Sequence, residues 1–468
     1  MVIEMGMAMD LDSAKNGELM VSAGDRALLV DLYQLTMGAC YWAEGIAQKT
    51  AKFEVFVRRL PVGFGYLVAM GLEQGLQYLA GLRLTGDQVE WLRGTGIFDG
   101  APDAFWEAIA PDKFLFEGTV WAVPEGTPIL ANEPILRIEA PLWQAQWVET
   151  YLLTTLNYQT LIASRAAGMR DGAGEDAALL EFGTRRAFGP QASVWAARAA
   201  IASGFTGTSN VLAAQQLGVL PRGTMAHALV MAIASQEGSE LGAFQAFHRA
   251  FPGAPLLVDT YDAIAAVDRL AAEVAAGRMI VPAVRLDSGD LVALSKGVRS
   301  RLPDTKIFAS GDLDGAEIAR LQAAGAVIDG YGIGTKLVTG KPVNGVYKLV
   351  ELDGVPVMKE ADGKVTYPGA KQIFRRWDND GNWLGDRLGL ATELPEADEK
   401  PLLVKVMEGG DRCYPVQRLE DIAAFGRSQV KTLPEAARRA IQPEPLSAQL
   451  SEALLQLTDR TRRSRPIA

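Results

Sequence analysis

The sequence predicts an α/β fold in which a (β/α) barrel is accompanied by an α+β domain built from both ends of the chain. Between residues 178 and 336, short apolar segments each end in small or polar residues, and alanine- and leucine-rich helical stretches such as 263–276 and 315–324 separate most of them. Strands that alternate with helices form parallel βαβ units, and about seven such units suit a barrel better than an open sheet. In chain order the seven segments are 179–186, 204–209, 223–227, 256–262, 284–290, 307–312 and 327–335.

The composition is that of an ordinary globular enzyme, and 468 residues leave room for two or three domains. Hydrophobic residues make up 49% and the net charge is −10, which argues against a general nucleic-acid or membrane-surface binder. The two cysteines, Cys40 and Cys413, provide neither a disulfide framework nor a cysteine metal site. The first residues lack the layout of a signal peptide, and no apolar run approaches the ~18 residues that span a bilayer. We therefore expect a cytoplasmic protein.

Residues 1–22 have no periodicity and are expected to form a flexible tail ahead of an N-terminal α+β domain over 23–140. From Arg26 a stripe of leucines predicts a helix, and Tyr33 lies on a neighbouring face of it. Such a tyrosine is either a buried core residue or a ligand contact. Both interpretations stay open at this point.

The rest of the N-terminal domain alternates between strand and helix patterns. Residues 52–58 alternate at period two, which predicts a strand with one solvated face. Short polar helices are expected within 81–110, and turn residues punctuate a meander of strands over 114–138. The barrel domain is expected over 141–345, beginning with a long amphipathic helical stretch over 141–167.

The C-terminal segment, 346–468, returns to strands without helical partners. Residues 347–359 are split by Asp353-Gly354 and predict a hairpin, and 401–407 predicts another strand. We expect these strands to rejoin the sheet of the N-terminal domain. Residues 434–468 are charged and helical, and they end in a basic tail that is expected to be solvated.

The chain has two histidines, and only one stands at a strand end. His248 falls on an amphipathic helix, where a surface or core-edge position is expected. His227 follows Gly223-Thr224 and precedes an apolar helix at the mouth of a predicted strand. A structural histidine is the simple alternative, but this one can also serve as a base, a ligand or a nucleophile that accepts a phosphoryl group.

Two carboxylates flank a turn directly after a predicted strand. Asp287 and Asp290 belong to Asp-Ser-Gly-Asp, and Arg285 precedes them by two residues. Oxygen ligands beside a cation fit a Mg²⁺-bound diphosphate or the hydroxyls of a ribose. The same four residues also form common turns and helix caps. The pattern therefore indicates a ligand site only because it stands at a predicted strand-to-helix junction.

A glycine-rich segment follows the last predicted strand and is a candidate for phosphate binding. Gly332, Gly334 and Thr335 offer backbone N–H groups without Cβ obstruction and one hydroxyl. Barrels commonly bind phosphate after their last two strands. The segment is neither a P-loop nor a dinucleotide fingerprint, and a merely flexible loop is the alternative.

A pair of arginines, Arg185 and Arg186, follows the first strand of the barrel region. A guanidinium group is suited to bidentate capture of a carboxylate or phosphate. Solvated surface arginines are the alternative, and we expect at least one of the two to be of that kind.

Together these pieces resemble the nicotinate phosphoribosyltransferases, which belong to the type II phosphoribosyltransferase group. The similarity extends from about residue 28 to about residue 376. It rests on short motifs in a fixed order: Asp31-Leu32-Tyr33-Gln34-Leu35-Thr36-Met37, Glu181-Phe182-Gly183-Thr184-Arg185-Arg186-Ala187, Gly207-Thr208-Ser209-Asn210, Gly223-Thr224-Met225-Ala226-His227, Val258-Asp259-Thr260-Tyr261-Asp262, Arg285-Leu286-Asp287-Ser288-Gly289-Asp290 and Gly332-Ile333-Gly334-Thr335.

The resemblance implies an irregular α/β barrel beside the N-terminal domain, and a homodimer with active sites at the interface. It implies that nicotinate and phosphoribosyl pyrophosphate (PRPP) give nicotinate mononucleotide and pyrophosphate in NAD biosynthesis, with Mg²⁺ and coupled ATP hydrolysis. That chemistry builds oxocarbenium charge and a departing polyanion, so its site needs cations and oriented carboxylates more than a strong base.

The resemblance also implies roles for individual residues. His227 is the histidine that ATP phosphorylates, and the catalytic aspartates Asp287 and Asp290 face the ribose and the Mg²⁺-diphosphate. Tyr33 and Thr224 are expected to contact nicotinate. The cations expected near its carboxylate are Arg285 and Arg185 or Arg186, and the seat of the PRPP 5′-phosphate is expected at Gly332, Gly334 and Thr335.

Two positions depart from the family pattern, and three alternatives remain. Gln191 stands where an aspartate is common, and Ala228 stands where a hydroxyl or acidic residue is common. A nicotinamide enzyme of the same fold would need no paired cations, so the arginines favour nicotinate. A quinolinate enzyme would need a denser basic pocket and no phosphorylated histidine. A catalytically silent relative would have lost key residues, and none is missing.

Overall fold

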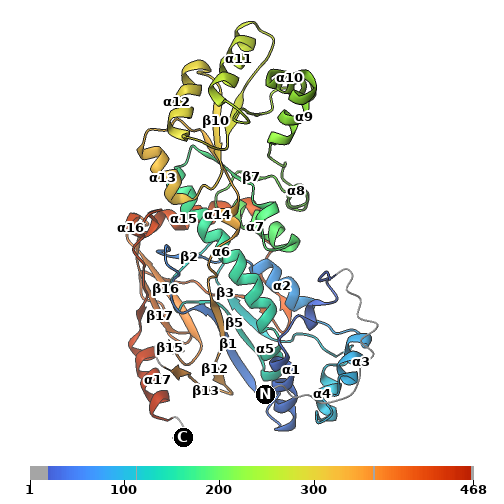
Figure 1. Cartoon of the computed structure of the whole chain (residues 1–468). Coiled ribbons are helices and arrows are strands. Elements are labelled where there is room, and N and C mark those ends of the chain that lie inside the picture. The colour runs from blue at the N-terminus through green and yellow to red at the C-terminus, as the bar shows by residue number, and fades with distance from the viewer. Residues whose placement is uncertain (1–18, 112, 362–363, 465–468) are drawn as a thin grey trace.

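The computed structural model describes residues 19–111, 113–361 and 364–464. The expected tail over 1–22 therefore lies almost wholly outside the described residues, as does the very end of the basic C-terminus. Figure 1 shows two regions, a mainly antiparallel one that contains N-terminal and C-terminal segments and a barrel-like one above it, with helix α6 (Glu149–Ala173) leading from one to the other. No helix in the described ranges is long and apolar enough to cross a bilayer.

A seven-stranded antiparallel sheet forms the centre of the lower region. In spatial order its strands are β13 (Val355–Pro356), β12 (Gly345–Leu352), β1 (Thr50–Val57), β5 (Pro134–Pro141), β3 (Thr119–Ala122), β19 (Val404–Glu408) and β20 (Asp411–Arg412). Strand β1 pairs with both β5 and the C-terminal β12, and β3 pairs with β19. The expectation that C-terminal strands rejoin the N-terminal sheet is confirmed. The proposed boundaries at 140 and 345 stay predictions.

A second sheet lies against the first and comes wholly from the C-terminal segment; its strands pair antiparallel except for β17 and β21, which are parallel. Its strands, in spatial order, are β18 (Glu399–Pro401), β16 (Lys371–Trp377), β17 (Trp383–Leu390) and β21 (Gln449–Leu450). Two small strand pairs complete the region: β2 (Leu67–Val68) with β4 (Pro128–Ile129), and β14 (Glu360–Ala361) with β15 (Lys364–Val365).

The prediction of a solvated face on β1 is wrong. Glu54 on that strand is fully buried, and its carboxylate binds Lys371 of β16 through an ion pair of 2.8 Å and through the Lys371 backbone N–H. Arg137 of β5 donates to the Lys371 carbonyl oxygen. The second face of β1 is therefore covered by a strand far away in the sequence, which the local alternation of polar residues cannot reveal.

The helices of the lower region surround these sheets. They are a 3₁₀ turn at Arg26–Leu28, α1 (Leu32–Ala43), α2 (Leu72–Ala80), α3 (Gly86–Gly94), α4 (Asp103–Ala108), α5 (Leu142–Trp147), α15 (Leu419–Thr432), α16 (Glu435–Arg438) and α17 (Glu452–Arg463). Helices α3 and α4 are the short helices expected within 81–110. The long helical stretch expected over 141–167 forms as α5 and α6, but α6 is not amphipathic as expected. It is buried on most sides because α2, α7, α13 and β12 all pack against it.

The upper region contains a six-stranded parallel sheet. In spatial order the strands are β7 (Gly207–Thr208), β6 (Ala178–Glu181), β11 (Gly330–Ile333), β10 (Lys306–Ser310), β9 (Ala283–Leu286) and β8 (Leu256–Leu257). The helices around it are the 3₁₀ turn η3 (Thr184–Arg186), α7 (Pro190–Ala202), α8 (Val211–Leu217), α9 (His227–Glu237), α10 (Glu240–Ala250), α11 (Ala263–Ala275), α12 (Leu291–Arg301), α13 (Gly315–Ala323) and α14 (Thr335–Val338).

One of the seven expected strands does not form, and this makes the barrel irregular. Residues 223–226 have no strand structure, and β7 and β8 do not pair with each other in the described ranges. Pro221 and Gly223 disfavour a ladder there, because proline lacks an N–H group and glycine offers no side chain to pack. The segment is held instead by single hydrogen bonds, such as Arg222 N–H to the Thr208 carbonyl.

Candidate active site

The carboxyl ends of β9 and β10 place a network of carboxylates and hydroxyls at one edge of the parallel sheet. The Ser310 hydroxyl donates to Asp287 Oδ1 at 2.5 Å. Asp259 Oδ2 accepts from the Asp287 backbone N–H at 2.7 Å and from the Ser288 hydroxyl at 2.9 Å. Asp287 is thus fixed from two sides, while its second oxygen, Oδ2, faces His227.

His227 begins helix α9 and its two ring nitrogens have different surroundings. Nδ1 lies 3.1 Å from the Thr260 hydroxyl, within hydrogen-bond distance. Nε2 lies 3.9 Å from Asp287 Oδ2, too far for a hydrogen bond, and both side chains are 39% exposed. Thr260 therefore orients the ring, and Nε2 is the nitrogen that a ligand can reach.

Arg285 comes from β9 and projects into the same edge. Its Nη2 donates to the Met225 carbonyl at 3.2 Å, and its guanidinium carbon lies 5.9 Å from the centre of the Phe182 ring. Burial lowers the pKa of the guanidinium, although the Asp287 and Asp259 carboxylates act in the opposite direction. Its Nε is buried and has no hydrogen-bond partner in the structure. A half-buried cation with an unused donor is suited to an anionic ligand.

The two arginines of η3 differ in their relation to this cluster. Both side chains are exposed. The positive charge of Arg185 further lowers the pKa of Arg285, which indicates that Arg185 is near the site. Two cations that repel each other in the free protein together favour a negatively charged ligand between them.

The glycine-rich segment divides between a strand and a turn. The sequence suggested that Gly332 lies in a loop. The structure instead places it inside β11, where it pairs with Ser310 and Leu180. A Cβ at Gly332 would come within 2.4 Å of the Phe182 ring, so close packing already explains this glycine. Gly334 and Thr335 do stand at the strand end, and Thr335 is exposed as the first residue of α14.

Asp290 and Thr224 already have structural partners. Asp290 Oδ1 accepts the backbone N–H groups of Val292 and Ala293 at 3.0 and 3.1 Å and caps α12. The Thr224 hydroxyl donates to the Pro255 carbonyl, and Thr224 is adjacent to Met225, which holds Arg285. Thr224 therefore lies beside the cluster, and Asp290 contributes at most its second oxygen to a ligand.

A Mg²⁺ ion fits this edge only together with a ligand. Among the described residues no group of three or more histidine, cysteine or carboxylate side chains is arranged to hold a metal ion alone. Mg²⁺ is usually bound by one or two carboxylates together with substrate phosphates. The half-exposed Asp287, with Oδ2 turned away from its hydrogen-bonded side, is a suitable ligand of that kind.

Tyr33 is the one predicted site residue that the chain does not bring to this edge. Helix α1 lies at the lower end of Figure 1, whereas α9 and β10 lie in the upper part. The Tyr33 side chain is 46% exposed. Burial and the neighbouring Glu149 carboxylate raise the pKa of Tyr33 to about 12, so the phenol stays protonated at neutral pH.

Sequence reasoning missed the roles of Asp259, Thr260 and Ser310. All three stand at predicted strand ends, and that position was a usable signal. Their function as supports depends on which side chain each one meets across neighbouring strands, and one sequence does not show this.

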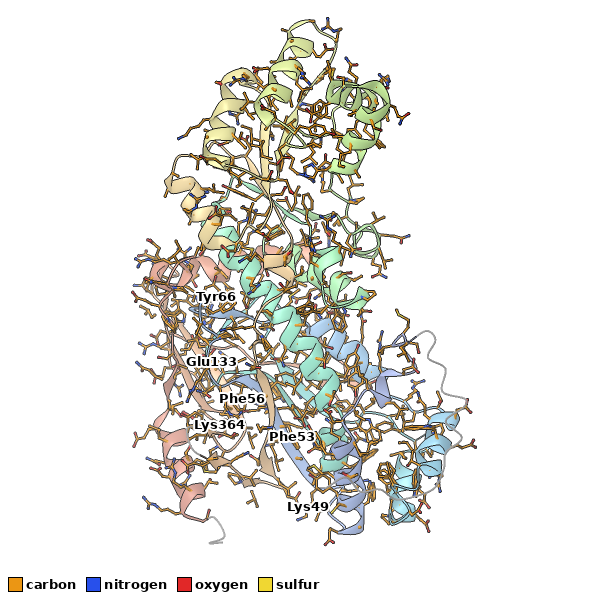
Figure 2. The ribbon with its side chains drawn as sticks, in the orientation of Figure 1. Lys49, Phe53, Phe56, Tyr66, Glu133 and Lys364 are labelled. Carbon is orange, nitrogen blue, oxygen red and sulfur yellow. The ribbon has the colours of Figure 1, made fainter. Side chains whose placement is uncertain are left out.

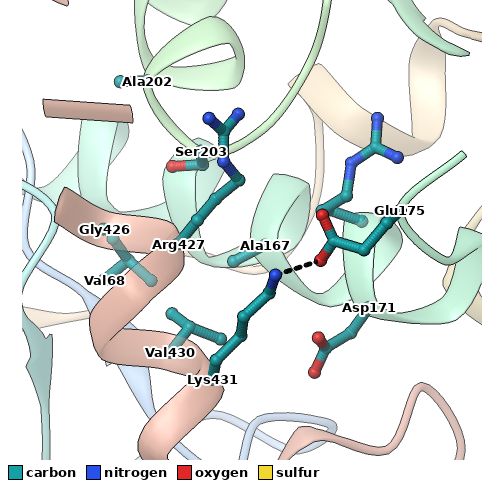
Figure 3. Close-up of a pocket in the computed structure, with 11 residues that line it drawn as sticks. Val68, Ala167, Asp171, Glu175, Ala202, Ser203, Gly426, Arg427, Val430 and Lys431 are labelled. Atoms are coloured by element: carbon teal, nitrogen blue, oxygen red, sulfur yellow. Dashed lines mark ion pairs between the residues drawn. The ribbon is translucent and has the colours of Figure 1, made fainter. Parts of the chain in front are cut away.

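The cavity shown in Figure 3 lies elsewhere and is too small for a substrate. It has a volume of about 20 Å³, which suits a single water molecule, and it lies between α6, α7 and α15. Lys431 and Glu175 form an ion pair of 2.9 Å at its rim. None of the predicted site residues lines it.

Comparison with known families gives matches over most of the chain. Residues 28–157 match the nicotinate phosphoribosyltransferase N-terminal domain, residues 177–367 match the nicotinate phosphoribosyltransferase family, and residues 392–458 match its C-terminal domain. Nicotinate phosphoribosyltransferase pncB2 of Mycobacterium tuberculosis is 42% identical over 423 residues, which are 88% of each chain. The Bacillus subtilis nicotinate phosphoribosyltransferase is 38% identical over 91% of this chain and 93% of its own.

Solved structures agree in fold over nearly the whole chain. Human nicotinic acid phosphoribosyltransferase superposes with a TM-score of 0.79 at 30% identity, covering 92% of this chain and 99% of the human one. A protein from Pyrococcus furiosus described as nicotinate-nucleotide pyrophosphorylase superposes with a TM-score of 0.71 at 25% identity, covering 89% and 98%.

Proposed function

Because the chain belongs to the nicotinate phosphoribosyltransferase family, we propose that this enzyme of NAD biosynthesis couples its transfer reaction to ATP hydrolysis through phosphorylation of His227. The transfer joins nicotinate to the phosphoribosyl group of PRPP and releases pyrophosphate. A pentosyltransferase that consumes ATP in this way also counts as a ligase. The observation that carries the proposal is the grouping of His227, Arg285 and Asp287 at one edge of the parallel sheet.

In the transfer step the pyridine nitrogen of nicotinate attacks C1 of the ribose. The C1–N bond forms as the bond from C1 to the diphosphate oxygen breaks, and the pyrophosphate leaves with that electron pair. Arg285, with Arg185 nearby, is placed to hold the nicotinate carboxylate. Asp287 would hold Mg²⁺ together with the diphosphate, and that ion would supply positive charge to the leaving group. Gly334 and Thr335 offer N–H groups and a hydroxyl to the 5′-phosphate.

In the coupling step His227 Nε2 attacks the terminal phosphorus of ATP, and ADP leaves as the N–P bond forms. Thr260 keeps the lone pair of Nε2 turned toward the ligand by binding Nδ1. The nearby Asp287 carboxylate is placed to stabilise the positive charge that develops on the ring. Water later cleaves the N–P bond and releases phosphate, so the complete cycle consumes one ATP.

The position of Tyr33 supports a site shared between two copies of the chain. Its exposed ring lies in the lower region, away from His227 of the same chain. In a homodimer the ring of one copy reaches the site of the other and stacks on nicotinate. Mixing Tyr33→Ala and His227→Ala proteins in equal amounts, each of them deficient alone, should then restore about a quarter of the wild-type ATP-coupled rate. No recovery after confirmed subunit exchange would contradict sharing.

The phosphorylation itself is tested with ATP labelled at its terminal phosphate. The wild-type protein should acquire acid-labile label, and His227→Ala should acquire none while keeping slow PRPP-dependent turnover without coupling. His248→Ala is the matched control because the chain has only these two histidines. Equal labelling of the His227→Ala and wild-type proteins would overturn the role of His227.

A further inference from the structure

A cleft lies between helices α9 (His227–Glu237) and α11 (Ala263–Ala275), in the upper part of Figure 1. The residues that line it come from these two helices, from the turns beside them and from the first residue of α10. Its volume is about 530 Å³, which is within the range of small-molecule sites. We call it the α9–α11 cleft.

The α9–α11 cleft continues the face of α9 on which His227 stands. Met231 and Ser235 line the cleft, and they follow His227 at intervals of four and eight residues, which place all three on one face of the helix. From the α11 side the cleft is lined by Tyr261, which comes directly after Thr260. The Thr260 hydroxyl lies 3.1 Å from His227 Nδ1. The cleft is therefore adjacent to the phosphate-accepting histidine on both sides.

The length of the cleft suits a nucleotide. A helix rises ~1.5 Å per residue, so Ser235 lies about 12 Å along the axis of α9 from His227. An extended nucleoside triphosphate covers a distance of this order between its base and its terminal phosphate. A nucleotide whose terminal phosphate meets His227 Nε2 can therefore place its base and ribose between α9 and α11.

Glu240, the first residue of α10, lines the cleft and has an unused acceptor. Its side chain is buried, with 7% exposed, and its Oε1 has no hydrogen-bond partner among the described residues. Burial raises the pKa of Glu240, while the Arg269 guanidinium, which also lines the cleft, acts in the opposite direction. A buried acceptor without a donor is costly, and a ligand with an N–H group would satisfy it.

The cleft also offers apolar surface for a flat ring. The Tyr261 side chain is 65% exposed, and Met231 of α9 is 55% exposed. Aromatic rings stack on nucleobases whatever the base, and a methionine side chain adapts to an aromatic surface. These two side chains supply affinity for a base, whereas Glu240 supplies a test of its edge.

We propose that the α9–α11 cleft binds the adenosine part of the ATP whose terminal phosphate reaches His227. Glu240 accepts a hydrogen bond from the exocyclic amino group of adenine, and the Tyr261 ring packs against the base. The inference rests on the proposed function, because it requires that ATP phosphorylates His227. It adds the residues that select the base of the nucleotide.

The preference for adenine is tested by labelling His227 from ATP or GTP, each labelled at its terminal phosphate. Guanine carries a carbonyl oxygen where adenine carries the amino group, so Glu240 should make the wild type prefer ATP. Glu240→Gln offers an amide N–H to that oxygen, and we expect the preference for ATP to fall by about tenfold. Glu237→Gln is the matched control, because Glu237 is exposed and is not among the described residues that line the cleft. It should keep the wild-type preference.

A second pair of variants tests the ring and does not depend on a buried residue. Tyr261→Ala should weaken the binding of a non-hydrolysable ATP analogue by about tenfold in calorimetric titrations. Tyr261→Phe keeps the ring and should bind the analogue as the wild type does. PRPP binding should be unchanged in all of these proteins, which shows that they are folded.

The outcomes separate this inference from the proposed function. Unchanged base preference in Glu240→Gln, together with wild-type affinity in Tyr261→Ala, would overturn the adenosine site. So would weaker analogue binding with an unchanged ATP requirement for labelling, because the cleft would then hold a different nucleotide. If the wild-type protein acquires no label while the variants still weaken analogue binding, the phosphorylation of His227 has failed and the adenosine site stands.

Discussion

The two regions of the molecule place a carboxylate beside a basic side chain in opposite ways. In the antiparallel region, Lys371 and Glu54 lie 2.8 Å apart with side chains 2% and 0% exposed, and Arg375 and Asp386 lie 2.6 Å apart with both at 0%. At the edge of the parallel sheet, the His227 ring and a carboxylate lie 3.9 Å apart, and both are 39% exposed.

The difference separates groups that determine how the chain folds from groups that remain available to ligands. Each buried pair has lost its water and is surrounded by protein, so removing one partner leaves an uncompensated charge. Such pairs fix the contact between strands that are far apart in the sequence, as Glu54 and Lys371 do. At the strand ends, Arg285 keeps an unused donor and His227 keeps a free nitrogen. Unsatisfied and half-exposed groups of this kind are typical of functional sites.

The largest expected effect comes from breaking a buried pair. Arg375 donates from Nε and Nη2 to Asp386 and also binds the Pro128 carbonyl oxygen. We expect Arg375→Ala to lower the free energy of unfolding by ~3–5 kcal/mol, measured by urea denaturation. Arg376→Ala is the matched control, because its pair with Asp398 is 42% and 45% exposed, and it should cost less than ~1 kcal/mol. Similar losses in both variants would remove the distinction between the two regions.

Arg285 tests the ligand-facing side of the comparison. We expect Arg285→Ala to weaken nicotinate binding by roughly 10- to 100-fold, since a charged hydrogen bond to the ligand carboxylate is lost. ATP binding should change far less, and the free energy of unfolding should change little. Calorimetric titration of both ligands measures this, with the exposed Arg186→Ala as control. Equal losses for nicotinate and ATP would reassign Arg285.

Thr260 provides a smaller effect in the same cluster. Thr260→Val keeps the shape of the side chain and removes the hydroxyl that lies near His227 Nδ1. With the ring no longer oriented, we expect the ATP-dependent rate to fall by about tenfold. The slow ATP-independent rate should be unchanged. A fall in both rates by the same factor would show that Thr260 acts on the transfer step or on folding.

Glu133 gives an effect on stability whose size depends on pH. Glu133 is buried among the antiparallel strands (Figure 2), and burial, followed by the adjacent Asp386 carboxylate, raises its pKa well above the ordinary 4.5. A raised pKa in the folded state contributes stability that is fully present below pH 4.5 and is lost as pH rises toward the folded pKa. The substitution Glu133→Gln removes this pH-dependent loss of stability, because an amide does not ionise.

We therefore expect Glu133→Gln to be more stable than the wild type at neutral pH, because an amide has no charge to bury. The advantage should shrink as pH falls toward 4.5. Denaturation curves at several pH values measure it. A difference that grows toward acidic pH would mean that Glu133 is ionised in the folded protein.

The sequence predicted those features whose causes are local. Alternating strands and helices predicted the parallel sheet, and their polar ends predicted His227, Arg285 and Asp287 as a group. Features caused by distant residues were missed. Residues 52–58 were expected to have a solvated face because nothing in that stretch reveals Lys371, which lies 317 residues after Glu54.

The same distinction applies within the site. Thr260 and Ser310 act through neighbours on other strands, so no local pattern predicts their contacts. Gly332 was expected in a phosphate-binding loop, but the structure places it inside β11 against Phe182. Tyr33 was assigned to nicotinate only through the family resemblance, and the role proposed for it depends on a second copy of the chain.

The most direct test of the proposed function is a product assay with PRPP and Mg²⁺, offering either nicotinate or nicotinamide, with and without ATP. The proposal predicts nicotinate mononucleotide, formed faster when ATP is present, together with ADP and phosphate. Nicotinamide mononucleotide would mean that Arg285 and Arg185 do not select a carboxylate. Nicotinate mononucleotide formed at one rate regardless of ATP would contradict coupling through His227.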